Sequence, residues 1–165
     1  MFNKINCLKT KKGFTIFESL IAIFVLLVGI LGAMTLILNV VNLIGLSSSQ
    51  LTAAYLAQEG VEIVRNIRDT NWLSSNSFDF NLSNGAYEVQ YSDSSLTIAG
   101  SPRFLKINAA GYYNYIGGTD TKFTRTITLS YPAAYILNVK VDVNWQEKGK
   151  SNNFSAQANL YNFNQ

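Results

Sequence analysis

A long apolar run near the N-terminus constrains this chain more than any other feature of its sequence. From Leu20 to Leu38 the run is interrupted only by two glycines and Thr35. No charged residue lies between Glu18 and Glu59. At about 1.5 Å per residue, a helix of this length covers the roughly 30 Å hydrocarbon thickness of a bilayer. The run therefore predicts a transmembrane helix, and the remainder of the 165 residues leaves room for one modest domain.

The charge distribution indicates how this segment is oriented. Four lysines, at positions 4, 9, 11 and 12, precede the apolar run, whereas nine basic residues face ten acidic ones from Phe14 onward. Basic residues that flank a first membrane segment stay cytoplasmic, so we expect the C-terminal part outside. The overall charge of +3 comes from the N-terminal lysines and does not indicate nucleic acid as a partner.

Cysteine and histidine are too scarce for the usual catalytic and metal centres. Cys7 is the only cysteine, and the chain has no histidine. The part expected outside therefore lacks the residues for a disulfide, a zinc site or a Cys-His nucleophile. Asp69 and Asn71 are closely spaced, but they lack the glycine and the downstream glutamate of a calcium loop. We expect no enzyme activity, no cofactor and no metal site.

Glu18 stands at the front edge of the apolar run, where a carboxylate is costly. Insertion into a membrane costs about 3 kcal/mol for such a group, so Glu18 should have a partner. A cleaved secretory signal has a shorter apolar stretch than this one. If the chain is cut between Gly13 and Phe14, the new amino group lies one helical turn from Glu18 on the same face. A carboxylate from an adjacent copy of the chain can then neutralise that amine.

The residues around this position resemble the processing site of type IV prepilins and pseudopilins. The segment reads KKGFTIFESL, with a basic pair, Gly-Phe-Thr, a glutamate fifth after the cut and then a charge-free helix. The resemblance implies that Gly13 ends a cleaved leader, that Phe14 becomes an N-methylated first residue, and that Glu18 is the assembly glutamate. It also implies three kinds of partner: a prepilin peptidase/methyltransferase, other pilins or pseudopilins, and the inner-membrane assembly machinery.

Two further features bear on this resemblance. The continuation AAYLAQEGVEIVRNIRDTNW is similar to PilV-like minor pilins, which favours a minor pilin within the family. Many major pilins carry a proline in the middle of the membrane helix, and this chain has Thr35 at that position. A proline kink is therefore not implied here.

The rest of the pattern predicts an α+β fold of the type IV pilin kind. We expect a leader at 1–13, a transmembrane and assembly helix at 14–46, an amphipathic continuation at 47–72 and an antiparallel β head at 73–165. The helix stripe follows spacings of three and four: Ala53, Leu56, Ala57, Gly60, Ile63, Val64 and Ile67.

Alternating apolar residues predict the strands of the head. A hairpin is expected around Asn84-Gly85, with arms at 78–82 and 87–91, and two less regular segments follow at 104–107 and 112–116. The last third predicts a meander, with strands at 123–129, 137–145 and 154–160 and one apolar face on the helix.

Polar residues of the head are expected to be structural or solvated. Nine tyrosines, including Tyr112, Tyr113 and Tyr115, favour core packing or subunit contact over stacking on nucleic acid, because few basic residues accompany them. The acidic residues of the alternating and turn segments are expected on solvated surfaces: Asp79, Glu88, Asp93, Asp120 and Asp142.

The leading hypothesis is a structural subunit, a minor pilin or pseudopilin that is cut and built into a type IV pilus-like filament. An uncleaved membrane-anchored binding module with a tyrosine-rich sheet stays open, as does a secretion or DNA-uptake pseudopilin. We expect a single pass in the cytoplasmic membrane with the head outside, in contact with the lipid bilayer before assembly. A cell-surface or periplasmic filament is the expected final location.

Overall fold

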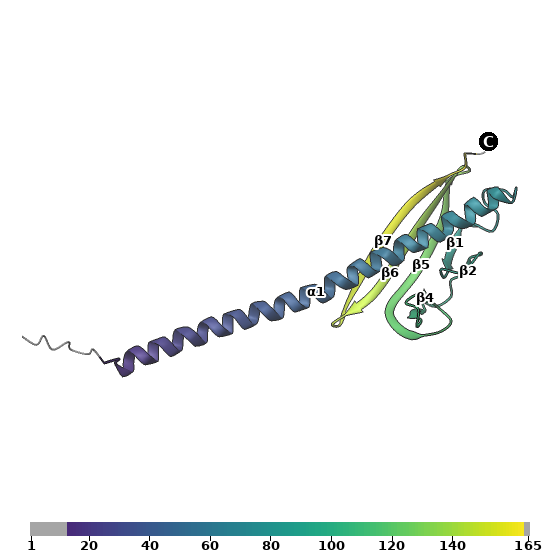
Figure 1. Cartoon of the computed structure of the whole chain (residues 1–165). Helices are drawn as coiled ribbons and strands as arrows, with labels where there is room; N and C mark the ends of the chain where they lie inside the picture. Colours follow the sequence, from purple (N-terminus) through teal and green to yellow (C-terminus); the bar gives the residue numbers. More distant parts are fainter. Residues whose placement is uncertain (1–12, 164–165) are drawn as a thin grey trace, which may run out of the picture. The chain divides into compact units, whose positions relative to one another are not determined.

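The computed structural model describes residues 13–163 and consists of one long helix and an antiparallel sheet (Figure 1). The chain divides into two compact units, which meet between Gly45 and Leu46. The α+β architecture confirms the predicted fold class, a long N-terminal helix packed on an antiparallel sheet. The elements are α1 (Ile16–Leu73), β1 (Gly85–Glu88), β2 (Thr97–Ile98), β3 (Phe104–Ile107), β4 (Tyr113–Asn114), β5 (Thr119–Ala133), β6 (Ile136–Glu147) and β7 (Lys150–Tyr161).

The first unit contains the part of α1 that was predicted to cross a membrane. Every large apolar side chain from Phe14 to Ile44 is exposed, and this stretch makes α1 long and apolar enough to span a bilayer. Thr35 donates its hydroxyl to the Leu31 carbonyl at 2.8 Å. The one hydroxyl in the middle of the apolar run is therefore satisfied within the helix, and no break in α1 occurs there.

The second unit is built around the predicted C-terminal meander. β5, β6 and β7 are antiparallel neighbours, and the register sets Ile127 opposite Val141 and Val141 opposite Ala156. The other side of β5 pairs with both β1 and β3, and the two-residue strands β2 and β4 lie beyond these. The segment predicted at 104–107 is β3, whereas the segment predicted at 112–116 contributes only β4.

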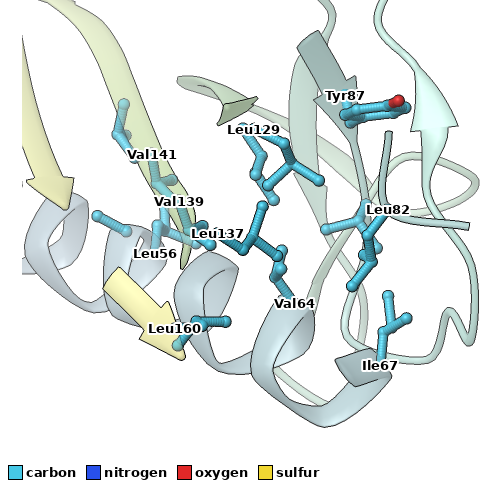
Figure 2. Packing of buried hydrophobic residues seen from close by; sticks show 14 of the residues in the cluster. Leu56, Val64, Ile67, Leu82, Tyr87, Leu129, Leu137, Val139, Val141 and Leu160 are labelled. Atoms are coloured by element: carbon cyan, nitrogen blue, oxygen red, sulfur yellow. The ribbon is translucent and has the colours of Figure 1, made fainter. Parts of the chain in front are cut away.

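The apolar stripe of the helix packs on the meander and forms the core. Figure 2 shows Leu56, Val64 and Ile67 of α1 beside the inward side chains of the sheet. Gly60 lies at the closest approach, where an added Cβ would be only 3.0 Å from Val141 Cγ1. The buried partners on the strands are Ile127, Leu129, Leu137, Val139, Val141, Val143 and Leu160. The predicted helix stripe and the predicted inward face of the meander are both confirmed.

The hairpin predicted around Asn84-Gly85 is wrong. Residues 78–82, expected as its first arm, form turns instead, and the Asn71 side chain donates a hydrogen bond to the Phe80 carbonyl at 2.8 Å. The predicted second arm is shorter than expected, because β1 covers only four residues and pairs with β5 and β2. The Phe80 carbonyl, which a strand would have used in the sheet ladder, is therefore bound by Asn71 at the end of the helix.

Candidate functional site

The start of α1 is defined by a side-chain cap on Thr15. The Thr15 hydroxyl accepts a hydrogen bond from the backbone N–H of Glu18 at 3.2 Å, while its carbonyl accepts one from Ser19 N at 3.1 Å. A threonine at the N-cap with a glutamate three residues later is the capping-box pattern. The sequence analysis missed this capping role of Thr15, although the spacing Thr-x-x-Glu was visible in the sequence.

The predicted cleavage site lies just outside this cap. Gly13 and Phe14 precede the first helical residue, and both are exposed. A Cβ added at Gly13 would meet nothing within 4 Å. The Gly13–Phe14 peptide bond is therefore free of helical hydrogen bonding and is accessible within the described part of the chain.

Glu18 lies in the first turn of α1 and is exposed. An acidic side chain at this position stabilises the helix, because the unpaired N–H groups of the first turn carry partial positive charge. Within residues 13–163, no ion pair involves Glu18. Gly13, Phe14 and Glu18 thus lie close together at one helix end. The leader lysines lie outside the described residues.

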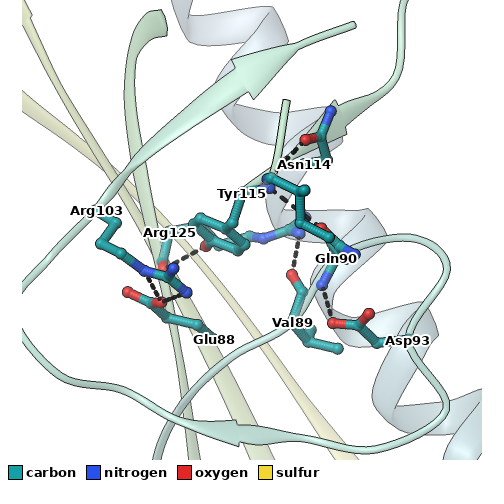
Figure 3. Close-up of polar contacts among 9 residues, drawn as sticks. Glu88, Val89, Gln90, Asp93, Arg103, Asn114, Tyr115 and Arg125 are labelled. Atoms are coloured by element: carbon teal, nitrogen blue, oxygen red, sulfur yellow. Dashed lines mark hydrogen bonds and ion pairs between the residues drawn. The ribbon is translucent and has the colours of Figure 1, made fainter. Parts of the chain in front are cut away.

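In the head, the most deeply buried polar group is Arg125 of β5 (Figure 3). Its Nη1 donates to the Leu56 carbonyl at 3.0 Å and to Glu59 Oε2 at 2.6 Å, and its Nη2 donates to the Val89 carbonyl at 2.6 Å. Arg125 Nε has no partner among the described residues. One guanidinium therefore joins β5, the helix and the segment after β1.

A second buried charge lies beside this network. Glu88 was expected on a solvated face, and this is wrong, since its side chain is only 5% exposed. It accepts a hydrogen bond from Arg103 Nε at 2.7 Å, and the Arg103 guanidinium also lies over the Tyr115 ring. Tyr115 in turn donates its hydroxyl to the Arg125 carbonyl. Tyr115 thus links the two arginines, and Arg103 pairs with the buried Glu88 carboxylate.

A third polar cluster joins the helix to the strands near the β6–β7 turn. Glu147 Oε2 accepts a hydrogen bond from Ser49 Oγ at 2.7 Å and pairs with the Lys122 ammonium, which also donates to Ser49 Oγ. The hydrogen bonds from Lys122 and Ser49 hold the pKa of Glu147 below its ordinary value. The cluster ties α1, β5 and β6 together at this end of the head.

The remaining polar residues singled out in the sequence have structural contacts. Asn71 binds a backbone carbonyl and Asp69 accepts from Arg68, so neither is set up as a ligand. Among residues 13–163, no group of three or more His, Cys, Asp or Glu side chains is placed to hold a metal ion. Tyr113 packs edge-on against Phe123, and Tyr112 stacks on Tyr91 with 4.8 Å between ring centroids.

The fold and the N-terminal segment define a class: an α+β protein whose N-terminal helix is long and apolar enough to cross a bilayer and whose C-terminal unit is a compact helix-and-sheet head. No protein-family model matches the chain, and comparisons with curated proteins and with solved structures find no match either. Function is therefore inferred from the residues of the chain itself.

Proposed function

We propose that this chain is a structural subunit of a type IV pilus-like filament, a minor pilin or pseudopilin. A prepilin peptidase/methyltransferase cuts it after Gly13 and methylates Phe14, and the mature chain then joins other pilins through the inner-membrane assembly machinery. Before assembly the helix crosses the cytoplasmic membrane with the head outside. After assembly the subunit is part of a filament at the cell surface or in the periplasm.

The observation that carries this proposal is the combination of a capped helix start and an unpaired Glu18 within the described chain. The Thr15 hydroxyl caps the backbone N–H of Glu18, so this N–H already has an acceptor. A carboxylate at the edge of an apolar helix is stabilised when it meets a positive group. The α-amino group of Phe14 in an adjacent subunit would supply one.

The apolar surface of α1 gives the proposal its second support. The large apolar side chains from Phe14 to Ile44 are exposed in the described chain. Lipid can cover them in the membrane, and neighbouring helices of the same kind can cover them in a filament. A subunit that moves from one environment to the other needs this apolar helix in both states.

N-terminal sequencing and intact-mass measurement of the protein from native membranes test the proposal. The expected chain begins at a methylated Phe14 in cells with an active prepilin peptidase, and at Met1 in matched cells that lack the enzyme. A chain that begins at Met1 in both strains would favour the second candidate, an uncleaved membrane-anchored binding module.

A further inference from the structure

The face of the sheet that points away from α1 has a distinctive composition. Along β5 and β6 most inward positions are buried, whereas along β7 they are half-buried apart from the buried Leu160; the outward positions alternate with them. Within 124–130, 138–146 and 151–159, the outward charges are Lys140 and Asp142, which pair with each other at 2.9 Å. The other outward side chains carry hydroxyl or amide groups: Thr124, Thr126, Thr128, Ser130, Asn138, Asn144, Gln146, Ser151, Asn153, Ser155, Gln157 and Asn159.

An open cavity of about 610 Å³ lies on this face. Four of the residues that line it form one row across the sheet, since Phe104 is opposite Thr124, Thr124 is opposite Asn144, and Asn144 is opposite Asn153. Residues opposite each other in a sheet point to the same side. The volume falls in the range of sites that bind small molecules, about 300–1,000 Å³.

The row combines one exposed ring with oriented hydrogen-bonding groups. Phe104 is 57% exposed, so a face of its ring is open to a ligand. Asn153 Nδ2 donates to Asn144 Oδ1 at 2.8 Å, which fixes the two amides side by side. That bond leaves Asn144 Nδ2 as a donor and Asn153 Oδ1 as an acceptor at the cavity.

The cavity carries no uncompensated charge. Among the described residues, Lys122 is the one charged residue that lines it, and its ammonium is bound by Glu147 and by the Ser49 hydroxyl. A charged ligand would lose hydration here without gaining a counter-charge. An entirely apolar ligand would leave the asparagine amides without partners.

We propose that this cavity binds a neutral oligosaccharide. A pyranose ring has an apolar C–H face that can pack on Phe104, and its hydroxyls match the amide and hydroxyl groups of Asn144, Asn153 and Thr124. The inference does not depend on whether the chain is cleaved or assembled.

Trp145 provides a reporter for the test. It contributes to the cavity lining from a buried, inward position next to Asn144, with 4% of the residue exposed, and Trp72 is the only other tryptophan of the chain. In a Trp72→Phe background, ligand-induced changes in emission therefore come from Trp145. The full chain is used in phospholipid nanodiscs, because sugar-based detergents would compete for the site. The probes are neutral hexasaccharides of glucose, mannose and N-acetylglucosamine, with hexagalacturonate and hexaglucosamine as charged comparisons.

At least one neutral hexasaccharide is expected to change Trp145 emission with a Kd of about 1 mM or tighter, as for a small solvent-exposed site. Phe104→Ala and Asn153→Leu should each weaken binding at least about tenfold, whereas Phe163→Ala, an exposed phenylalanine away from the cavity, should leave it unchanged. Circular dichroism checks that every variant is folded.

Three results would overturn the inference. They are the absence of binding by every neutral probe up to about 10 mM, unchanged affinity in both cavity variants, and affinity for a charged probe equal to or higher than that for the neutral ones.

Discussion

Arg125 of β5 and Glu59 of α1 form an ion pair across the interface between sheet and helix, with 2.6 Å between Nη1 and Oε2. The Arg125 side chain is 0% exposed, whereas 32% of the Glu59 side chain remains exposed. The positive charge is thus fully enclosed in the head and the negative charge is partly hydrated. Arg125 also binds two carbonyls, from Leu56 and Val89, so one residue holds three segments of the chain together.

Removing the negative partner should destabilise the head. Glu59→Gln leaves a buried cation without its counter-charge, which costs 3–5 kcal/mol in fully buried pairs and about 2 kcal/mol here, because Glu59 is partly solvated. Glu62→Gln is the matched control, since Glu62 forms an exposed pair with Arg65 on the same helix. Urea denaturation of the full chain in detergent measures the unfolding midpoint of each variant. Equal midpoints for the two variants would show that the buried pair contributes no more than an exposed one.

Gly13→Val should block cleavage without disturbing the chain. Gly13 has open space around it, so the branched side chain fits the folded protein. The same side chain would crowd the scissile bond in the peptidase. Gel mobility and intact mass in cells with an active prepilin peptidase measure the cut fraction. Efficient cleavage of Gly13→Val would place the cut elsewhere or exclude this processing.

Glu18→Ala and Glu18→Gln should leave membrane insertion and cleavage near normal but reduce incorporation into filaments. The unpaired amine of the neighbouring subunit would otherwise have to be buried without a counter-charge. The measurement is the amount of each variant in sheared filaments relative to membranes, beside wild type. Normal incorporation of both variants would contradict the pairing.

Comparison with Thr15→Val separates charge pairing by Glu18 from capping of the helix start. The cap bond uses the Glu18 backbone N–H and the Thr15 hydroxyl, so Glu18→Gln keeps it and Thr15→Val removes it at a cost of about 1 kcal/mol. If charge pairing controls assembly, Glu18→Gln should reduce incorporation more than Thr15→Val does. The reverse order would mean that the local helix start matters more than the carboxylate.

Val141→Asp should destabilise the head by several kcal/mol unless the carboxyl group protonates, because Val141 is fully buried against Gly60 of the helix. Gln146→Asp, on the exposed side of the same strand, is the control and should change the melting temperature little. Circular dichroism of the full chain in detergent measures the melting temperature of each variant. An unchanged melt for Val141→Asp would contradict the inward orientation of this position.

Glu147 should make stability fall at acidic pH. Hydrogen bonds from Lys122 and Ser49 lower the pKa of Glu147 in the folded chain. Its contribution is therefore fully present above the unfolded pKa, about 4.3, and is lost as the pH falls through the lower folded value. Melting temperatures between pH 7 and 3 should decline less steeply for Glu147→Gln than for wild type. Parallel curves would show that the cluster is not linked to folding.

The sequence predicted those parts of the fold whose periodicity is long and regular. The helix stripe repeats over four turns from Ala53 to Ile67, and the three strands of the meander alternate over seven or more residues. Each pattern therefore predicted one type of secondary structure. The N-terminal features were equally local. Gly13, Phe14 and Glu18 are close in sequence, so their proximity at one helix end follows from helix geometry alone.

Short or irregular segments were decided by tertiary contacts. Phe78, Phe80 and Leu82 alternate as a strand would, yet Asn71 at the end of the helix binds the Phe80 carbonyl, and the segment turns. Asn84-Gly85 looked like a hairpin turn, but the Asn84 side chain instead accepts a hydrogen bond from Tyr131 N of β5. A few alternating residues stabilise a strand only slightly, so one long-range hydrogen bond is enough to change the outcome.

Three features could be predicted from local sequence, because each depends on a repeating pattern of side chains along the chain: the apolar helix, the helix stripe and the inward face of the meander. The tertiary structure decided which charges are buried. Arg125 occupies an inward strand position and Glu88 lies in a short strand, and neither position reveals its partner. Glu59 is 66 residues from Arg125 and Arg103 is 15 from Glu88, so only the folded chain brings each pair together and allows Arg125 and Glu88 to be buried.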